Sequence, residues 1–241
     1  MYAVFKRELF SFLSSMVAYI TIGIFLLVSG LLLWVFPDTS ILEYGYAELG
    51  GFFSLVPYLF MFLIPAITMR SFAEERREGT YELLITRPIT LWEIITAKYL
   101  ASLVIVLFAL VPTLVYYYAI YQLGFPEGNI DSGAVTGSYI GLFLLGAAFT
   151  SMGIFASALT KNQIIAFVVC AGLCAFAYLG FDYTSQLFAF QGLDTIIMHL
   201  GINQHYTSIS RGVLDTRDLL YFISFTVIFL LITRLWIGGK R

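Results

Sequence analysis

The chain has 241 residues, of which 60% are hydrophobic and only 12% are charged, and its formal net charge is −2. Soluble domains typically carry about 25% charged residues, so this composition excludes an ordinary soluble protein and indicates an integral membrane protein. The sequence pI near 5.7 also excludes the strongly basic surface with which nucleic-acid-binding proteins hold phosphate groups.

The N-terminal stretch, residues 2–14, predicts an amphipathic helix that lies in the membrane interface. Its apolar face consists of Tyr2, Phe5, Leu9 and Phe12. Lys6 and Arg7 fall largely elsewhere, as is typical of interfacial helices. The 21 residues that follow, 16–36, are uncharged and lack a small-residue cleavage site, so we interpret them as a first span rather than as part of a signal peptide.

A polar break over residues 37–50 precedes the second predicted span, residues 51–69. Within that break, Ser40 and Glu43 have the spacing of a helix cap, which predicts a short surface helix. The second span contains Pro57 and Pro65, and proline inside a spanning helix frees a backbone carbonyl and bends the helix.

The segment from residue 70 to residue 98 is the most highly charged part of the chain. It holds 10 of the 28 formal charges. Each charge would cost roughly 2.5–3.5 kcal/mol in hydrocarbon, so we expect the whole segment to lie in water, held between the second and third spans. We interpret a small helix in this segment as a docking site for a partner protein. The alternative interpretation is a loop whose helix lies on the lipid headgroups.

Inside this segment the sequence predicts two short helices and a helix start. Glu74–Glu78 continues the second span as a helix, and Gly79 ends it. Apolar residues recur at helical spacing over Tyr81–Arg87, which predicts a short amphipathic helix that ends before Pro88. A Thr90–Glu93 capping box then starts the helix that runs into the third span.

Three further spans are predicted at residues 99–120, 134–158 and 164–181, separated by short polar loops. The fourth is rich in small residues with the spacing that lets another helix approach closely; we interpret this as packing within the chain, with a dimer face as the alternative. These small residues include Gly137, Gly141, Gly153 and Ser157. Cys170 and Cys174 lie one turn apart in the fifth span and are interpreted as apolar packing residues rather than as a redox or metal pair.

Residues 182–218 form the longest break and predict short helices on the outer leaflet before the last span, residues 219–237. His199 and His205 lie in this break, and two isolated histidines indicate a structural rather than a metal-binding role. Asp215 is expected to cap the last span.

The basic residues divide unequally between the two sides of this six-span layout. The side that carries the N-terminus, the 70–98 segment and the C-terminal end holds 11 of the 13 lysines and arginines. By the positive-inside rule this side is cytoplasmic, with both termini there. The chain contains no G-x-x-x-x-G-K-[ST] phosphate-binding loop and no metalloprotease or calcium-loop motif, so we expect it not to be an enzyme, with no cofactor or metal of its own.

Two stretches resemble a known family. EERREGTYELLITRPITLWEIITAKYLA, residues 74–101, resembles the coupling segment of ABC-2-type permeases, the membrane subunits of ABC transporters. HYTSISRGVLDTRDLLYFISF, residues 205–225, resembles the segment before the last span in gliding-type and related permeases. The chain most resembles the permease subunit of the gliding-motility ABC system, the GldF-like proteins.

The resemblance implies one all-α ABC-2-type transmembrane domain over residues 1–241, in a bacterial inner membrane. It implies a separate ABC ATPase that holds ATP and Mg²⁺, and a second permease, either identical or a sister chain, in contact with membrane lipid. The implied coupling residues are Glu74, Glu75, Arg76, Arg77, Gly79, Thr80, Tyr81, Glu82, Leu83, Leu84, Ile85, Arg87 and Pro88. In the family the second and fifth spans face the transport pathway, which implies a wall formed by Phe52, Phe53, Tyr58, Phe62, Phe176 and Phe181.

Three functions remain open at this point. The first is an ATP-driven exporter permease. The second is a scaffold whose ATP-driven motion assembles or powers an envelope machine without moving a solute. The third is a membrane sensor or a channel that works without an ATPase.

Overall fold

The computed structural model describes residues 1–37, 40–85, 89–185, 198–212 and 215–239. Within these ranges the secondary structure is helical, with no strand. The elements run in the order α1 (Tyr2–Leu13), α2 (Met16–Trp34), α3 (Ile41–Tyr44), α4 (Gly50–Thr68), α5 (Ala73–Glu78), α6 (Thr80–Ile85), α7 (Leu91–Leu110), the 3-10 turn η2 (Val111–Thr113), α8 (Leu114–Leu123), α9 (Ser132–Leu159), α10 (Gln163–Ala175), the π-helical turn η3 (Phe176–Gly180), α11 (Phe181–Ser185), α13 (Ile202–Ser210) and α14 (Thr216–Gly238).

Six helical segments in the described residues are long and apolar enough to span a membrane, which confirms the predicted all-α membrane fold. They are Met16–Trp34, Gly50–Glu78, Leu91–Leu123, Ser132–Leu159, Gln163–Ser185 and Thr216–Gly238. The fifth has 23 residues and is longer than the predicted 164–181, because η3 and α11 carry the helix on to Ser185. The second and third also extend beyond their predicted bounds, since α5 follows α4 after a short turn and α7 begins at Leu91.

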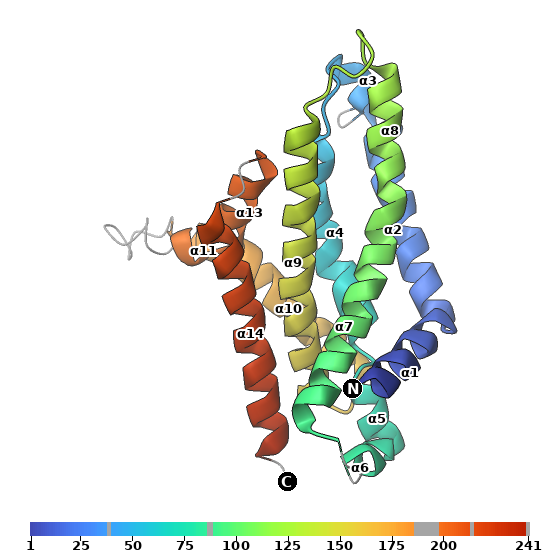
Figure 1. Cartoon of the computed structure of the whole chain (residues 1–241), viewed down its shortest axis with the longest axis vertical. Helices are drawn as coiled ribbons and strands as arrows, with labels where there is room; N and C mark the ends of the chain where they lie inside the picture. The colour runs from blue at the N-terminus through green and yellow to red at the C-terminus, as the bar shows by residue number, and fades with distance from the viewer. Residues whose placement is uncertain (38–39, 86–88, 186–197, 213–214, 240–241) are drawn as a thin grey trace.

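The central helix of the bundle is α9, which packs against α4, α7, α10, α13 and α14 (Figure 1). Its small residues make these approaches possible. A Cβ atom added at Gly153 would lie 2.1 Å from Thr68 Oγ1 of α4, and one at Gly141 would lie 3.0 Å from Ile209 Cγ2 of α13. These contacts confirm that the small-residue face of the fourth span serves packing within the chain.

Local capping explains where several helices begin. Thr90 and Glu93 form the predicted capping box of α7, with both reciprocal hydrogen bonds present. The predicted Asp215 cap of α14 accepts a hydrogen bond from the Arg217 amide. Asp131 and Asn162 cap α9 and α10 in the same way. These side chains satisfy backbone amides that a helix start otherwise leaves without partners.

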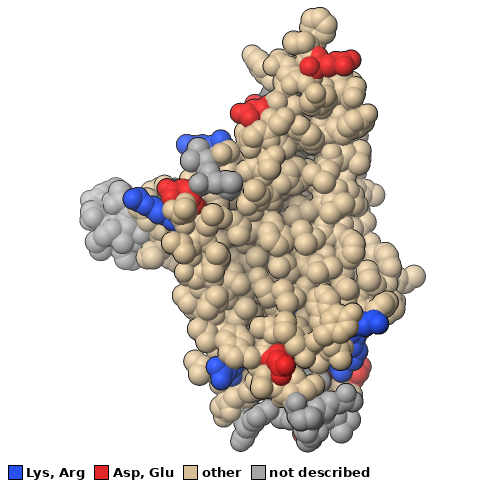
Figure 2. All heavy atoms as spheres, viewed as in Figure 1, with Lys and Arg blue, Asp and Glu red and all other residues tan. Residues whose placement is uncertain are grey.

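The bundle has two polar ends and an uncharged middle. On the face drawn in Figure 2, Lys, Arg, Asp and Glu lie toward the ends, and the band between them is free of charge. One end carries α5 and α6. The half of the bundle away from them carries α13 beside α9, and α3 lies at its tip (Figure 1). Both chain termini lie at the α5–α6 end, where the Met1 amino group is 3.6 Å from Glu93 Oε1.

The predicted N-terminal helix occurs as α1, and it packs against the bundle through one face. Its buried residues are Val4, Glu8 and Phe12, whereas Tyr2 is exposed. This face packs against α7, where Lys98 lies 3.0 Å from Glu8 Oε1. The position of α1 in the membrane interface stays a prediction.

A short helix before the last span occurs as predicted in the described part of that break, as α13, whereas α11 continues the fifth span and residues 186–197 lie outside the described residues. In α13, His205 Nδ1 lies 2.7 Å from Asp218 Oδ1 and His205 Nε2 lies 2.9 Å from the His199 carbonyl oxygen. The contact with Asp218 joins α13 to α14, which agrees with a structural role for His205.

The two cysteines are packing residues in the fifth span. Cys170 and Cys174 are buried on α10 with their Sγ atoms 3.9 Å apart, and they form no disulfide. Among the described residues, no three His, Cys, Asp or Glu side chains group closely enough to hold a metal ion.

Candidate functional site

The turn between α4 and α5 is fastened to the end of α9 by one hydroxyl group. Ser157 Oγ accepts hydrogen bonds from the Phe72 amide at 2.9 Å and the Ala73 amide at 3.1 Å. It also donates to the Met69 carbonyl oxygen at 3.0 Å. One side chain of α9 thus satisfies the backbone on both sides of the turn, so the direction in which α5 leaves the bundle is fixed by α9.

A second attachment holds α5 to the same end of α9. Arg76 Nη1 donates a 2.5 Å hydrogen bond to the Ala158 carbonyl oxygen, one of the carbonyls that the end of a helix leaves without an internal partner. The Arg76 guanidinium also lies over the Tyr81 ring, 5.0 Å from its centroid. Tyr81 in turn packs edge-on against buried Phe72, with ring centroids 6.4 Å apart.

The Tyr81 side chain, one of the predicted coupling residues, is half-buried. Its ring folds back onto α5, because Arg76 and Phe72 offer it a cation and an aromatic edge. Tyr81 therefore shapes the link between α5 and α6.

A buried lysine joins the α4–α5 turn to α7. Lys98 is 0% exposed, and its Nζ donates a 2.6 Å hydrogen bond to the Ser71 carbonyl oxygen. The same nitrogen lies 3.0 Å from Glu8 Oε1 of α1 and 3.1 Å from Glu75 Oε1 of α5. The prediction that the whole 70–98 segment lies in water is therefore wrong for Lys98, whose charge is balanced inside the protein by two carboxylates.

Arg7 completes this arrangement from α1. Its Nη2 atom lies 2.6 Å from Glu8 Oε1 and 2.5 Å from Glu75 Oε1. Burial by itself would lower the pKa of the Arg7 guanidinium, but its hydrogen bonds and attraction to Glu8 and Glu75 outweigh burial and raise that pKa. We call Arg7, Glu8, Glu75 and Lys98 the four-charge cluster; it carries no net charge and joins α1, α5 and α7.

The outer part of α5 and α6 is polar and exposed. Arg77, Glu78, Gly79, Thr80 and Glu82 all face away from the bundle. Gly79 ends α5 with φ +73°, a left-handed conformation that favours glycine, which confirms the predicted helix stop.

The remaining predicted coupling residues divide into two groups. Glu74 is half-buried and pairs with Arg70 at 3.1 Å, so like Glu75 and Arg76 it holds the segment in place. The side chains of Leu83, Leu84 and Ile85, and residues Arg87 and Pro88, lie outside the part of the chain that the structure describes. The apolar tip of α6 therefore stays a prediction.

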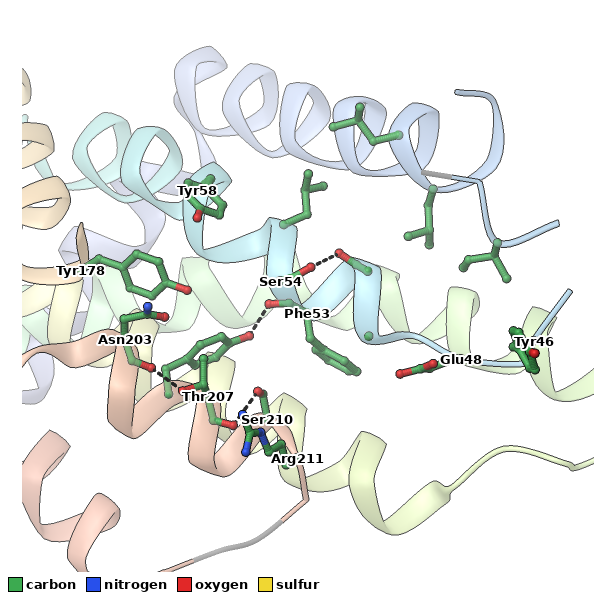
Figure 3. Close-up of a pocket in the computed structure, with 17 residues that line it drawn as sticks. Tyr46, Glu48, Phe53, Ser54, Tyr58, Tyr178, Asn203, Thr207, Ser210 and Arg211 are labelled. Atoms are coloured by element: carbon green, nitrogen blue, oxygen red, sulfur yellow. Dashed lines mark hydrogen bonds between the residues drawn. The ribbon is translucent and has the colours of Figure 1, made fainter. Parts of the chain in front are cut away.

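The six residues predicted for a pathway wall do not form one surface in this chain. Phe52 is fully buried, and its ring packs against Phe53 at a centroid distance of 5.4 Å. Phe53 and Tyr58 line a cavity at the α3–α13 end (Figure 3). Phe62 and Phe176 are exposed, at 66% and 59%. Phe181 is half-buried, with its ring centroid 5.6 Å from that of Phe176.

Three residues that hold the α5–α6 end were missed in the sequence: Glu8, Lys98 and Ser157. The sequence did contain a signal that Lys98 is buried. It is a lone charge with apolar neighbours on both sides, and it lies inside a helix that starts several residues earlier. No local signal could pair it with Glu8 or could single out Ser157 among the small residues of α9. These contacts join residues more than 80 positions apart.

The geometry can be compared with known proteins. A family model described as "ABC-2 family transporter protein" matches residues 38–237, which is most of the chain. The match contains α5, α6 and the cavity-lining residues from Ile41 onward, but it does not reach α1 or the part of α2 that lines the cavity. A search of curated proteins found no match.

Proposed function

The chain belongs to the ABC-2 family of transporter proteins, and we propose that it is the permease subunit that couples ATP hydrolysis by a separate ABC ATPase to substrate export. Such a permease is a membrane transport component and is normally not catalytic itself. In this proposal ATP and Mg²⁺ are held by the partner ATPase, and the present chain supplies the membrane path and the contact that receives the movement.

The observation that carries the proposal is the way α5 and α6 are attached. They project from one end of the bundle with charged, exposed side chains, yet the base of α5 is bonded to several helices at once (Figure 1). Ser157 and Ala158 bind it to α9, Lys98 binds it to α7 through Glu75, and Arg7 binds it to α1 through the same carboxylate. A push or pull on α6 would therefore tilt a group of membrane helices instead of bending a loose loop.

The same base continues directly into α4, which contains Pro57 and Pro65. Proline removes a backbone hydrogen bond from a helix, so these two positions can absorb a tilt of α4 at a lower cost than the rest of the helix. We propose that ATP-driven closure of the ATPase moves α6, and that α4 and α7 tilt in response.

We further propose that the α5–α6 end is cytoplasmic and that the membrane is the bacterial inner membrane. Arg76 and Arg77 belong to α5, Arg70 precedes it, and Lys161 follows the end of α9 that Arg76 contacts; both chain termini lie at the same end (Figure 1). An excess of lysine and arginine on short membrane-flanking segments marks the cytoplasmic side. Cleavage of α5–α6 by protease added outside intact spheroplasts would contradict this orientation.

We also propose that the chain pairs with a second permease, which is either identical or a sister chain. We propose in addition that the pair belongs to a gliding-motility system. The exposed aromatic side chains of Phe62 on α4 and Phe176 on η3 support a partner or pathway at these two spans. The likeness of residues 205–225 to gliding-type permeases supports the system. A force-transmitting scaffold would use the same ATPase contact, and substrate-stimulated ATPase activity in liposomes distinguishes the exporter from it.

The test of the ATPase contact changes the predicted tip of α6. Leu84→Asp, or deletion of residues 81–86, is expected to abolish co-purification with the ATPase while membrane insertion remains intact. The matched control is Leu123→Asp, the same substitution at an exposed leucine at the opposite end of the bundle. Unchanged ATPase capture by Leu84→Asp, or equal loss in Leu123→Asp, would overturn the proposal.

A further inference from the structure

A cavity of about 830 Å³ lies at the α3–α13 end, on the other side of the bundle from the ATPase contact. Figure 3 shows that α4 crosses it, with α2 on one side and α13 on the other. Residues from the last turn of α2 and the first turn of α4 line it, so the cavity lies where two spans leave the membrane. At this level a ligand would meet hydrocarbon on one side and water on the other.

The two walls of the cavity differ in chemistry. The wall next to α2 and α3 is aliphatic and includes Leu32, Leu33 and Ile41. The wall formed by α13 is polar. It presents Asn203, Thr207, Ser210 and Arg211. An apolar wall facing a polar wall suits a molecule that has an apolar chain at one end and a polar group at the other.

Most donors of the polar wall are already used by the protein. The Asn203 amide donates to Asp182 Oδ2 at 2.5 Å, and the buried Tyr206 hydroxyl donates to the Phe53 carbonyl oxygen at 2.5 Å. The Thr207 and Ser210 hydroxyls donate to backbone carbonyls of α13. The ligand must therefore be recognised mainly by the group whose donors remain available.

That group is Arg211, which follows α13 directly and is exposed at the cavity. Among the described residues its guanidinium makes no ion pair. The other charged lining residue, Glu48, folds back against the first turn of α4: its Oε1 lies 2.7 Å from where a Cβ of Gly50 would stand. A helix start attracts a carboxylate, so Glu48 is partly balanced and Arg211 is not.

We propose that this cavity binds an amphiphile with a phosphate headgroup, such as a phospholipid, with the phosphate on Arg211 and the chain along Leu32, Leu33 and Ile41. A guanidinium binds phosphate oxygens through two parallel hydrogen bonds, which gives both affinity and orientation. The site is independent of the ATPase contact, and it binds the ligand whether or not that molecule is transported.

The experiment measures lipid binding to the purified chain by native mass spectrometry in an uncharged detergent. The probes are a lysophosphatidylglycerol, a neutral alkyl glycoside of the same chain length, and inorganic phosphate. We expect the lysophospholipid to bind, and neither the glycoside nor phosphate alone to compete with it at equal concentration. Equal competition by phosphate would reduce the site to an anion site, and equal competition by the glycoside would reduce it to an apolar groove; each result would overturn the proposal.

Two pairs of variants locate the binding in this cavity. Arg211→Gln is expected to weaken lysophospholipid binding about tenfold, because a charge-assisted bond is lost. Its control is Arg217→Gln, because Arg217 is exposed and lies outside the cavity lining, so this variant should bind like the wild type. Gly51→Phe is expected to abolish binding by filling the cavity, since an added Cβ there meets no atom within 4 Å.

The control for the filled cavity is Gly23→Phe, which adds the same side chain to α2 at another position where a Cβ meets nothing within 4 Å. Binding that survives both Arg211→Gln and Gly51→Phe would overturn the proposal. Arg211 lies on the surface, so its variant tests the phosphate contact even where a cavity-filling variant fails to fold.

Discussion

Replacing Lys98 with methionine tests whether the four-charge cluster holds the α5–α6 end together. The substitution keeps the length and the apolar stem of the side chain and removes its charge. It takes one ammonium group away from Glu8 Oε1, Glu75 Oε1 and the Ser71 carbonyl oxygen, which lie 3.0, 3.1 and 2.6 Å away. The cluster then carries two carboxylates and one guanidinium, so its net charge changes from 0 to −1.

The expected loss of stability follows from burial. The Glu8 and Glu75 side chains are 10% and 14% exposed, so water can stabilise the surplus negative charge only weakly. Removing one partner of a buried ion pair typically costs about 3–5 kcal/mol. Arg7 remains in contact with both carboxylates and is itself 53% exposed, so we expect a loss near the lower end, about 3 kcal/mol.

The assay is equilibrium unfolding of the purified protein in mixed micelles, followed by tryptophan fluorescence as the SDS fraction rises. Lys161→Met is the control, because Lys161 is an exposed lysine. Adding Glu8→Gln to Lys98→Met restores a neutral cluster, formed by Arg7 and Glu75, and is expected to recover at least about 1 kcal/mol. A stability of Lys98→Met within about 0.5 kcal/mol of the wild type, or no recovery in the double variant, would refute the reasoning.

Two further substitutions test the attachment of α4 and α5 to α9. Ser157→Ala removes the partner of two buried amides and one carbonyl, and it is expected to cost about 1–3 kcal/mol in the same unfolding assay. The control Ser151→Ala should cost less, because the Ser151 hydroxyl bonds only within α9. Equal effects of the two substitutions would contradict the bridging role of Ser157. Gly153→Ala places a methyl group 2.1 Å from Thr68 Oγ1 and is expected to cost about 1–3 kcal/mol through overpacking. Gly172→Ala is the control, because nothing lies within 4 Å of the added Cβ, and it should be neutral or slightly stabilising. A destabilisation as large as that of Gly153→Ala would show that the loss of stability comes from the position in the helix and not from packing.

Local features of the sequence were sufficient to predict the spans and their starts. The membrane requires a run of about 20 apolar residues for each crossing, so composition alone locates the six spans. A cap forms between residues three positions apart or fewer, so Thr90, Glu93 and Asp215 could be recognised without any tertiary contact. The stop at Gly79 is local for the same reason.

The orientation of individual side chains within the spans could not be read in the same way. Phe52 and Phe62 both lie on α4 in an apolar run, yet Phe52 is fully buried and Phe62 is 66% exposed. Lipid and protein interior are equally apolar, so hydrophobicity does not distinguish the face of a spanning helix that packs from the face that meets lipid. This is why the predicted pathway wall divides between the interior, the cavity and the surface.

The sequence by itself determined that this chain crosses a membrane six times and that a charged segment with two short helices joins the second and third spans. Only the tertiary structure decided that this segment is rigidly held, because its supports, Lys98 with Glu8 and Ser157 with the Phe72 amide, join distant residues. A charge in a sequence favours water unless an opposite charge is brought to it, and only the packing of α1, α5 and α7 brings the four-charge cluster together.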